Sequence, residues 1–208
     1  MQIQVFSDTV CPWCRIGKQN LFAALEQWGQ PFELQWRAFQ LDPTTPKEGL
    51  PFRETMTKKF SGRADLPQLF NQVVQAGKAS GVRFDFDRVE FMPNTLLSHQ
   101  LIELMPGESQ TAFVDAVFRA YFEEGQDIGR LEVLLQLAAE VGGDPEQLRA
   151  RVATGEGEKQ VQEDLAFARQ VGISGVPFFI LNNKYALSGA QPVSAFLQAF
   201  QQATDAAK

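Results

Sequence analysis

The sequence has few of the residues that build metal centres and disulfide frameworks. It contains two cysteines and one histidine among 208 residues. A zinc site needs three or four protein ligands, and two cysteines with His99 supply too few at a useful spacing. A disulfide scaffold needs many more cysteines. We therefore expect no bound metal, and we expect a reducing compartment, where a cysteine pair serves chemistry more often than structure.

Positive charge and long apolar runs are also scarce. Nineteen Lys and Arg stand against 25 Asp and Glu, which gives a formal net charge of -6. Nucleic-acid binding needs clustered Lys and Arg, so no nucleic-acid partner is expected. The longest apolar stretches, such as 176–181, are too short to span a bilayer. Residues 1–10 alternate as a strand does and lack the features of a signal peptide, so we expect a cytoplasmic chain with no membrane partner.

Hydrophobic periodicity predicts an α/β start. Residues 2–7 and 32–39 each alternate between apolar and polar side chains, as half-buried strands do. Between them, a helix begins at Pro12, where the missing N–H of proline costs nothing, and ends at Gly29. A strand, a helix and a strand in this order predict two parallel neighbouring strands. Cys11 then lies at the N-terminus of the first helix.

The middle and the tail of the chain differ in their patterns. Residues 43–155 carry apolar stripes at helical spacing, with only 82–86 resembling a strand, and predict an all-helical insertion subdomain. Residues 156–208 predict a helix, a strand at 178–181, a turn at Asn182–Asn183, a second strand and a last helix. Together with residues 1–42, the tail predicts one discontinuous α/β domain.

The two cysteines are separated by two residues at the start of the first helix. The free N–H groups and the helix dipole there favour the thiolate of Cys11. Cys14 lies one turn later on the same face, close enough to form a disulfide with Cys11. In an exchange reaction Cys11 would attack, and Cys14 would resolve the mixed disulfide. Metal ligation and two buried structural thiols are the alternatives.

A proline precedes the buried strand of the tail. Pro177 cannot donate a hydrogen bond to a strand ladder, so Val176–Pro177 fits either a tight bend with a cis peptide bond or an ordinary trans proline at a strand start. If the start and the tail of the chain share one sheet, this loop lies beside the cysteine helix. The backbone of Val176 could then pair with an extended substrate.

Segments spread along nearly the whole chain carry a family resemblance. They are FSDTVCPWC (6–14) with IG (16–17), RAFQLDP (37–43), PNTLLSH (93–99), EGQDIG (124–129) and GVPFFILNNKYALSGAQP (175–192). With these segments the chain resembles the DsbA-like thiol-disulfide oxidoreductases, and most closely their FrnE-like branch. The resemblance implies a thioredoxin-like fold with a large all-helical insertion between a βαβ start and an αββα tail.

The resemblance also implies roles for the matching positions. Cys11 would be the nucleophile and Cys14 the resolving cysteine, without a cofactor. The expected partners are protein thiols and disulfides or glutathione, and the expected state is a monomer or a weak homodimer. Trp13 replaces the histidine of the periplasmic oxidases, so strong oxidising power is not implied. The residues expected to contact the substrate are Pro12, Trp13, Val176 and the cis proline Pro177.

Two other functions stay open on the same fold. Glutathione-dependent isomerases and kappa-type glutathione transferases need no second cysteine, so the presence of Cys14 argues against them. A non-catalytic, chaperone-like module would instead hold unfolded chains in an apolar cleft. Among the polar residues near the motifs, we expect Arg15 on the solvated surface, Asp8 in a turn, Asn94 as a helix cap and His99 satisfied by its neighbours.

Overall fold

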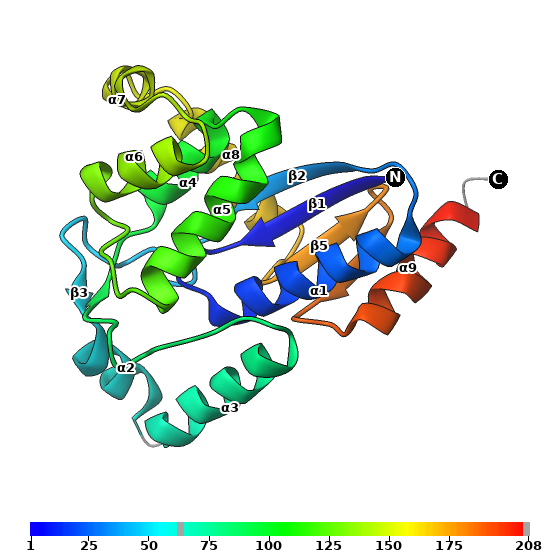
Figure 1. Cartoon of the computed structure of the whole chain (residues 1–208), viewed down its shortest axis with the longest axis horizontal. Helices are drawn as coiled ribbons and strands as arrows, with labels where there is room; N and C mark the ends of the chain where they lie inside the picture. Colours follow the sequence, from blue (N-terminus) through cyan, green and yellow to red (C-terminus); the bar gives the residue numbers. More distant parts are fainter. Residues whose placement is uncertain (62–64, 206–208) are drawn as a thin grey trace.

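A four-stranded sheet organises the chain (Figure 1). The computed structural model describes residues 1–61 and 65–205. Strand β1 (Gln2–Ser7) pairs in parallel with β2 (Glu33–Ala38) and antiparallel with β5 (Phe178–Leu181), which in turn pairs antiparallel with β6 (Tyr185–Ser188). The sheet order is β2-β1-β5-β6. The predicted parallel pair and the predicted meeting of the start and tail in one sheet are confirmed.

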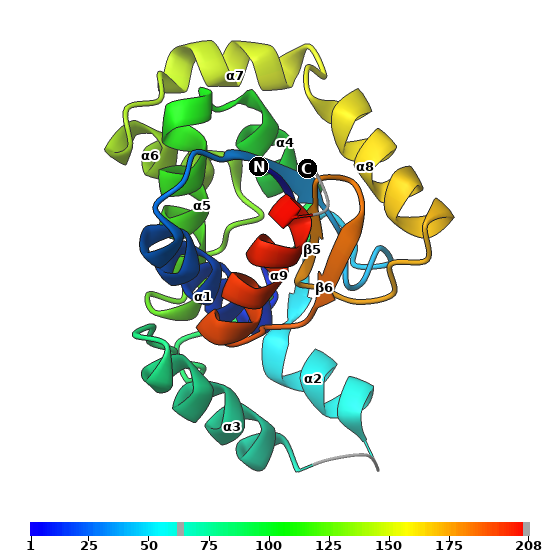
Figure 2. The same cartoon turned by 90° about the vertical axis from the view of Figure 1, so that its right-hand side faces the viewer.

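Helices cover both faces of this sheet. Helices α1 (Pro12–Trp28) and α9 (Val193–Asp205) pack together on one face, as Figure 2 shows. Helix α8 (Glu158–Gln170) covers the other face. Successive side chains of a strand point to opposite faces. Accordingly, Val5 lies in the main core with α1, whereas Phe6 packs against α8.

The insertion forms two groups of helices. One group, α2 and α3, stands at one end of the molecule beside a two-stranded sheet, and the other group packs against β2 and α1 (Figure 2). The bounds are β3 (Leu50–Pro51), α2 (Phe52–Phe60), α3 (Leu66–Ala79), β4 (Phe91–Met92), α4 (Leu96–Leu104), α5 (Gly107–Phe122), α6 (Leu131–Glu140) and α7 (Pro145–Ala153).

The strand expected at 82–86 is wrong. Among the residues that the structure describes, this segment pairs with no strand. It makes a backbone hydrogen bond to α5, from the N–H of Asp85 to the carbonyl of Phe122 at 2.7 Å. Its alternating apolar residues, Phe84 and Phe86, point into an aromatic cluster with Phe122. The alternation therefore reflects aromatic packing of an irregular segment. The short strands β3 and β4 pair nearby and were not expected.

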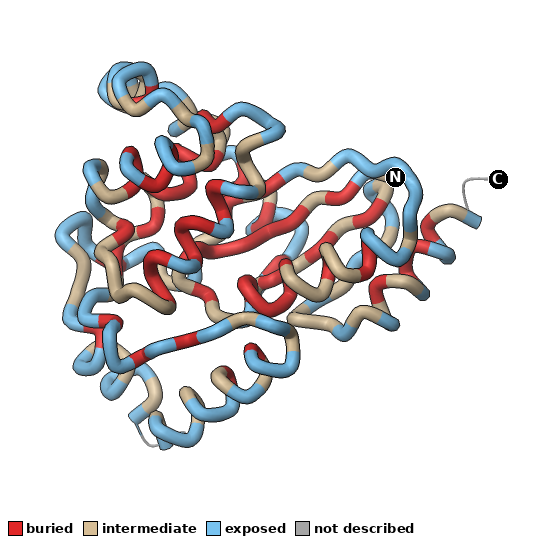
Figure 3. Tube along the Cα trace, viewed as in Figure 1, coloured by how far each residue is buried: buried red, intermediate tan, exposed pale blue. Residues whose placement is uncertain are grey.

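Buried residues occur both in the sheet and in the insertion, as the colouring of the chain trace in Figure 3 shows, and most of them belong to one core cluster. One cluster contains Val5 of β1, Leu21 of α1 and Val117 of α5. The division into residues 1–42 with 156–208 and residues 43–155 stays a prediction about how the chain is organised. Within the described part of the chain, no helix has both the length and the apolar character needed to cross a membrane.

Candidate functional site

Cys11 begins helix α1 and holds its sulfur at the helix N-terminus. Its backbone is extended (φ -93°, ψ 110°), and Pro12 occupies the first helical position. The sulfur accepts a hydrogen bond from the backbone N–H of Cys14 at 3.2 Å. Negative charge at a helix N-terminus is stabilised by such donors and by the helix dipole. A thiolate formed at Cys11 would keep this backbone hydrogen bond.

Cys14 lies one turn further along α1 and is as buried as Cys11, since 2% of each residue is exposed. Burial is the main cause that raises the pKa of the Cys14 thiol well above its usual value, and the hydrogen bond and charge of Cys11 raise it further. Both thiols are free. The pair thus combines a sulfur that receives one backbone hydrogen bond with a sulfur whose pKa is raised.

The loop before β5 faces the cysteine pair. The Val176–Pro177 peptide bond is cis. In the thiol form, Cys11 donates to the carbonyl oxygen of Val176 at 3.5 Å, across 165 residues of sequence. Pro177 is buried behind this contact. The sulfur of Cys11 therefore lies between the first turn of α1 and the backbone of this loop.

Gly17 allows α1 and the loop to approach each other closely. A Cβ atom at this position would lie 2.8 Å from Cγ of Pro177 and 3.2 Å from the ring of Phe179. Both distances are shorter than ordinary van der Waals contact. Sequence reasoning gave Gly17 no role, although a glycine inside a helical pattern is a recognisable signal of close packing.

A cavity of about 260 Å³ opens beside Cys11. Cys11, Trp13 and Val176 form one side of it, and α2, α3 and the segment before β4 form the other. Only 2% of Cys11 is exposed, whereas 42% of Trp13 is. Cys11 therefore borders this cavity while nearly all of its surface is covered. Five phenylalanines line it: Phe52, Phe60, Phe70, Phe86 and Phe122.

The structure brings the expected site residues together from two distant parts of the sequence. Cys11, Pro12, Trp13 and Val176 all line this cavity. The other two, Cys14 and Pro177, are buried beside them. Sequence reasoning missed the far wall of the cavity, which comes from the insertion. Its apolar stripes were assigned to the core, and nothing in their spacing separates a cavity wall from a core face.

The expectation that Arg15 lies on the solvated surface is wrong. Arg15 is 9% exposed and forms an ion pair with Glu123 at the end of α5. It also donates to the carbonyl oxygen of Arg83 at 2.6 Å and lies 5.4 Å from the ring centroid of Phe84. Burial acts to raise the pKa of Glu123, but Arg15 and Arg83 outweigh it and hold that pKa below its usual value. The insertion supplies these partners, and the local sequence of α1 does not show them.

Asp8 and His99 connect three segments behind the cysteine helix. Both side chains are buried. One oxygen of the Asp8 carboxylate accepts the backbone N–H of Leu41 at 2.7 Å, and the other lies 3.5 Å from Nε2 of His99. The same Nε2 donates to the carbonyl oxygen of Phe39 at 3.0 Å. His99 is therefore satisfied by its neighbours, as expected.

Asn94 lies at the start of α4, where a helix cap was expected. Its side-chain oxygen accepts the backbone N–H of Leu96 at 3.0 Å. Its amide group donates to the carbonyl oxygen of Thr45 at 2.7 Å. Asn94 thus satisfies one of the free donors of the helix and ties the helix to the preceding loop.

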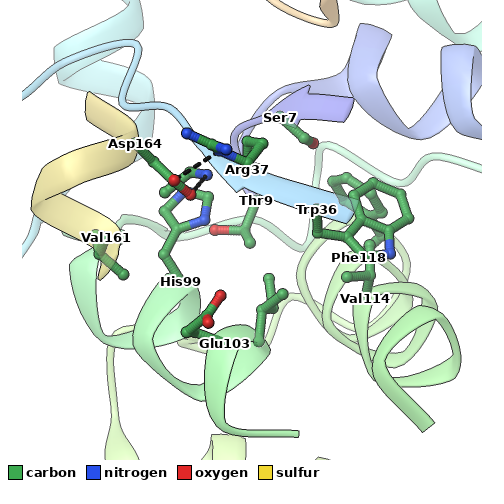
Figure 4. Close-up of a pocket in the computed structure, with 12 residues that line it drawn as sticks. Ser7, Thr9, Trp36, Arg37, His99, Glu103, Val114, Phe118, Val161 and Asp164 are labelled. Atoms are coloured by element: carbon green, nitrogen blue, oxygen red, sulfur yellow. Dashed lines mark hydrogen bonds and ion pairs between the residues drawn. The ribbon is translucent and has the colours of Figure 1, made fainter. Parts of the chain in front are cut away.

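A second polar cluster lies between β2 and the helices α4 and α8 (Figure 4). Arg37 on β2 pairs with Asp164 on α8, with 2.6 Å between Nε and Oδ1. Asp164 also accepts the backbone N–H of Ala38 at 2.9 Å. Burial raises the pKa of the nearby Glu103, and the charge of Asp164 adds to the rise while Arg37 opposes it. The cavity here measures about 20 Å³, roughly one water probe, which is too small for a substrate.

The cavity beside Cys11 is thus the candidate site, because both free thiols lie in it or next to it. Across residues 1–61 and 65–205, no three His, Cys, Asp or Glu residues gather as metal ligands would. The site instead offers the Cys11 sulfur, which receives a backbone hydrogen bond, and a second sulfur one turn away. A cavity borders the first of these residues. This combination suits thiol-disulfide exchange.

Comparison with known proteins agrees with this fold. The family model described as DSBA-like thioredoxin domain matches residues 2–201. A probable DsbA oxidoreductase from Streptomyces coelicolor superposes with a TM-score of 0.89 at 31% identity, over 99% of this chain and 90% of that one. YwbO of Bacillus subtilis (strain 168), an uncharacterized protein, is 28% identical over 188 residues and 88% of each chain.

A more distant structure shares the fold alone. The cytosolic disulfide reductase DsbM from Pseudomonas aeruginosa, in a structure with GSH, has a TM-score of 0.65 at 20% identity, over 97% of this chain and all of that one. The FrnE-like branch stays a prediction, because none of these comparisons separates the branches. The match over residues 2–201 nevertheless covers both the sheet and the insertion, and the chain belongs to the DSBA-like thioredoxin domain family.

Proposed function

We propose that this protein is a thiol-disulfide oxidoreductase that exchanges disulfides with protein substrates through Cys11 and Cys14. One observation carries the proposal: two free thiols, one turn apart at a helix N-terminus, lie in unequal environments beside a cavity. The sulfur of Cys11 accepts a hydrogen bond from the backbone N–H of Cys14, and the thiol of Cys14 has a raised pKa. Family membership supports redox chemistry in general, and the geometry supports the assignment of roles.

The reaction proceeds in two exchanges. The Cys11 thiolate attacks one sulfur of the substrate disulfide, forms a mixed disulfide and releases the other sulfur as a thiolate, which takes a proton from solvent. Cys14 then gives up its proton and attacks the Cys11 sulfur, which releases the second substrate thiol. Two electrons pass to the substrate, and a Cys11–Cys14 disulfide remains. Two molecules of a thiol such as glutathione return the pair to the dithiol and leave as their own disulfide.

The environment of Cys14 sets the order of these exchanges. A buried thiol with a raised pKa is a poor first nucleophile, because the thiolate is the reactive form. It becomes effective once Cys11 is bound in a mixed disulfide next to it, since the reacting atoms are then held at close range. Pro12, Trp13, Val176 and Pro177 surround this position, and we assign them to substrate contact. In a reducing cytoplasm, the pair would act as a reductase or an isomerase.

Single substitutions of the cysteines test the proposal. With insulin as the disulfide substrate and glutathione as the reductant, Cys11→Ser is expected to fall to the rate without protein. Cys14→Ser is expected to attack but not to resolve, so it accumulates a mixed disulfide that a non-reducing gel or intact-mass spectrum detects. Circular dichroism of both variants checks that the fold is retained. Full activity of a folded Cys11→Ser protein would disprove the assignment.

The same variants separate the competing functions. A glutathione-dependent transferase or isomerase needs one activated residue, so Cys14→Ser would keep full turnover of an aromatic electrophile with glutathione. A chaperone-like module would suppress aggregation of an unfolded protein equally well when both cysteines are serine. Loss of disulfide exchange in Cys11→Ser, with trapping in Cys14→Ser, excludes both outcomes as the main activity.

A further inference from the structure

We propose that the cavity beside Cys11 is a specificity site for an aromatic group carried by the molecule whose disulfide Cys11 attacks. The inference rests on the proposed function, because it names the substrate class for that reaction. Two sources can supply this chemistry: an aromatic side chain next to a substrate cysteine, or a small aromatic thiol in disulfide form. The experiment below distinguishes them.

Parallel phenyl rings form one wall of the cavity. Phe70 stacks on Phe86 with ring centroids 4.6 Å apart and an interplanar angle of 16°. Phe52 lies 5.7 Å from Phe70 and 6.3 Å from Phe86, at angles of 18° and 3°. All three line the cavity. An added ring can stack on such a wall or meet it edge-on, and either contact adds to the energy of burial, so the wall favours an aromatic group over an aliphatic one.

The other lining groups point to the same chemistry. Met56 and Met92 also line the cavity, and the flexible methionine side chain adapts its shape to the groups that it packs against. The strongly exposed polar lining residues, Lys59 and Gln72, lie at its outer edge. Polar groups also line the cavity, namely Asp8, Asp42, Thr45, Thr55 and Thr95. The two acidic side chains among them would oppose the carboxylates of glutathione.

The size of the cavity fits a ring system. A cavity of about 150 Å³ lined by Leu, Ile and Phe binds benzene, and this one measures about 260 Å³. It therefore has room for one ring with its linker or for two fused rings. Because Cys11 and the stacked rings line the same cavity, an aromatic group bound there holds the rest of its molecule next to the sulfur.

The contrast between two small disulfides tests the proposal. The first probe is the symmetric disulfide of 2-naphthylmethanethiol, and the second is glutathione disulfide, which lacks a ring. The value of kcat/KM for each is measured by the appearance of thiol. We expect the naphthyl probe to be favoured at least tenfold, which corresponds to about 1.4 kcal/mol. A third arm uses peptide disulfides with Phe or Ala next to the cysteine and shows whether a side chain can supply the ring.

A filling substitution and a matched control locate the effect. Leu69 lines the cavity from α3, so Leu69→Trp is expected to reduce the naphthyl-to-glutathione ratio at least fivefold. Gln68→Trp adds the same bulk one residue earlier, at an exposed position outside the cavity lining, and is expected to keep the ratio. Met56→Ser serves as a second cavity variant if Leu69→Trp does not fold. Sulfur-free 2-naphthylmethanol should compete with the naphthyl probe.

The outcomes separate this inference from the function on which it rests. If neither small disulfide exchanges with Cys11, and insulin does not either, the proposed function fails. If both exchange with equal efficiency, or if Gln68→Trp lowers the ratio as much as Leu69→Trp, the aromatic site is disproved and the oxidoreductase stands. A preference for the naphthyl probe with no difference between Phe and Ala peptides would assign the site to small thiols.

Discussion

At the scale of single residues, the cysteine pair shows how position decides chemistry. Two identical side chains one turn apart are equally buried but have different hydrogen-bond partners. Cys11 receives a backbone N–H at 3.2 Å, and Cys14 is buried with a pKa well above its usual value. The helix start places a backbone N–H at the first sulfur, and burial raises the pKa of the second. The proposed roles of nucleophile and resolving thiol rest on this difference.

The raised pKa of Cys14 predicts how stability depends on pH. An unfolded cysteine ionises near pH 8.5, whereas Cys14 keeps its proton to a higher pH in the fold. Below pH 8.5 the Cys14 thiol is protonated in both the folded and the unfolded protein, so its contribution to the free energy of unfolding is constant. Above it the unfolded chain loses the proton first, and the reduced protein should lose up to about 1.4 kcal/mol of unfolding free energy per pH unit.

Urea denaturation of the reduced protein between pH 7 and 9.5 measures this loss. Cys14→Ser lacks the titrating group, so the stability difference between the reduced wild type and this variant should decrease as pH rises past 8.5. A difference that stays constant over this range would show that the pKa of Cys14 is the same in both states. The window stops at pH 9.5 because tyrosine and lysine side chains ionise above it.

Single residues also mark where sequence reasoning ends. Local rules for helix and strand starts drew attention to the two cysteines, Val176 and Pro177. Pro12 and Trp13 were expected at the site because of the family resemblance, and contact of these residues with substrate stays a prediction. Arg15 could not be placed, since its partner Glu123 lies 108 residues away, directly after the end of α5. A buried ion pair between distant helices leaves no local pattern, and an isolated arginine usually lies on the surface.

At the scale of elements, the contact between α1 and the Val176–Pro177 loop determines the geometry of the site. Gly17 makes this contact, because any side chain there would collide with Pro177. Elements with regular periodicity could be predicted well from the sequence, including β1, α1 and the β5–β6 hairpin with its two left-handed asparagines. The segment 82–86 was mistaken for a strand because aromatic alternation looks the same in a sheet and in an irregular cluster.

Gly17→Ala should separate the two elements. The added methyl group would lie 2.8 Å from Pro177, so we expect a loss of about 1–3 kcal/mol of stability and slower disulfide exchange. Gly107→Ala is the matched control, since it also adds a methyl group to a helical glycine but meets nothing within 4 Å. Thermal unfolding and the insulin assay measure both effects. Equal behaviour of the two variants would remove the spacing role from Gly17.

At the scale of the whole molecule, buried polar contacts fasten the insertion and the tail to the sheet. Asp164 on α8 holds both the side chain of Arg37 and the backbone of Ala38 on β2 (Figure 4). Only 3% of the Asp164 side chain and 14% of the Arg37 side chain are exposed. Removing one member of such a pair leaves the other charge buried without compensation.

Asp164→Ala should therefore lower stability strongly, by about 3–5 kcal/mol. One continuous core joins the sheet and the insertion, so we also expect a single unfolding transition whose midpoint shifts equally by far-UV circular dichroism and by tryptophan fluorescence. Arg37→Met combined with Asp164→Leu should recover part of the loss. Two separate transitions would instead favour residues 43–155 as an independently folding unit.

The origin of the cavity walls has a consequence for how this protein diverges from its relatives. The reactive sulfur comes from residues 1–42, whereas the phenyl wall comes from a region some 40 to 75 residues further along the chain. Mutations in α2 and α3 can change which molecules are admitted without altering the electron chemistry at the helix start. Substrate choice and redox behaviour can then change independently of each other. Relatives with the same cysteine motif therefore need not share a substrate.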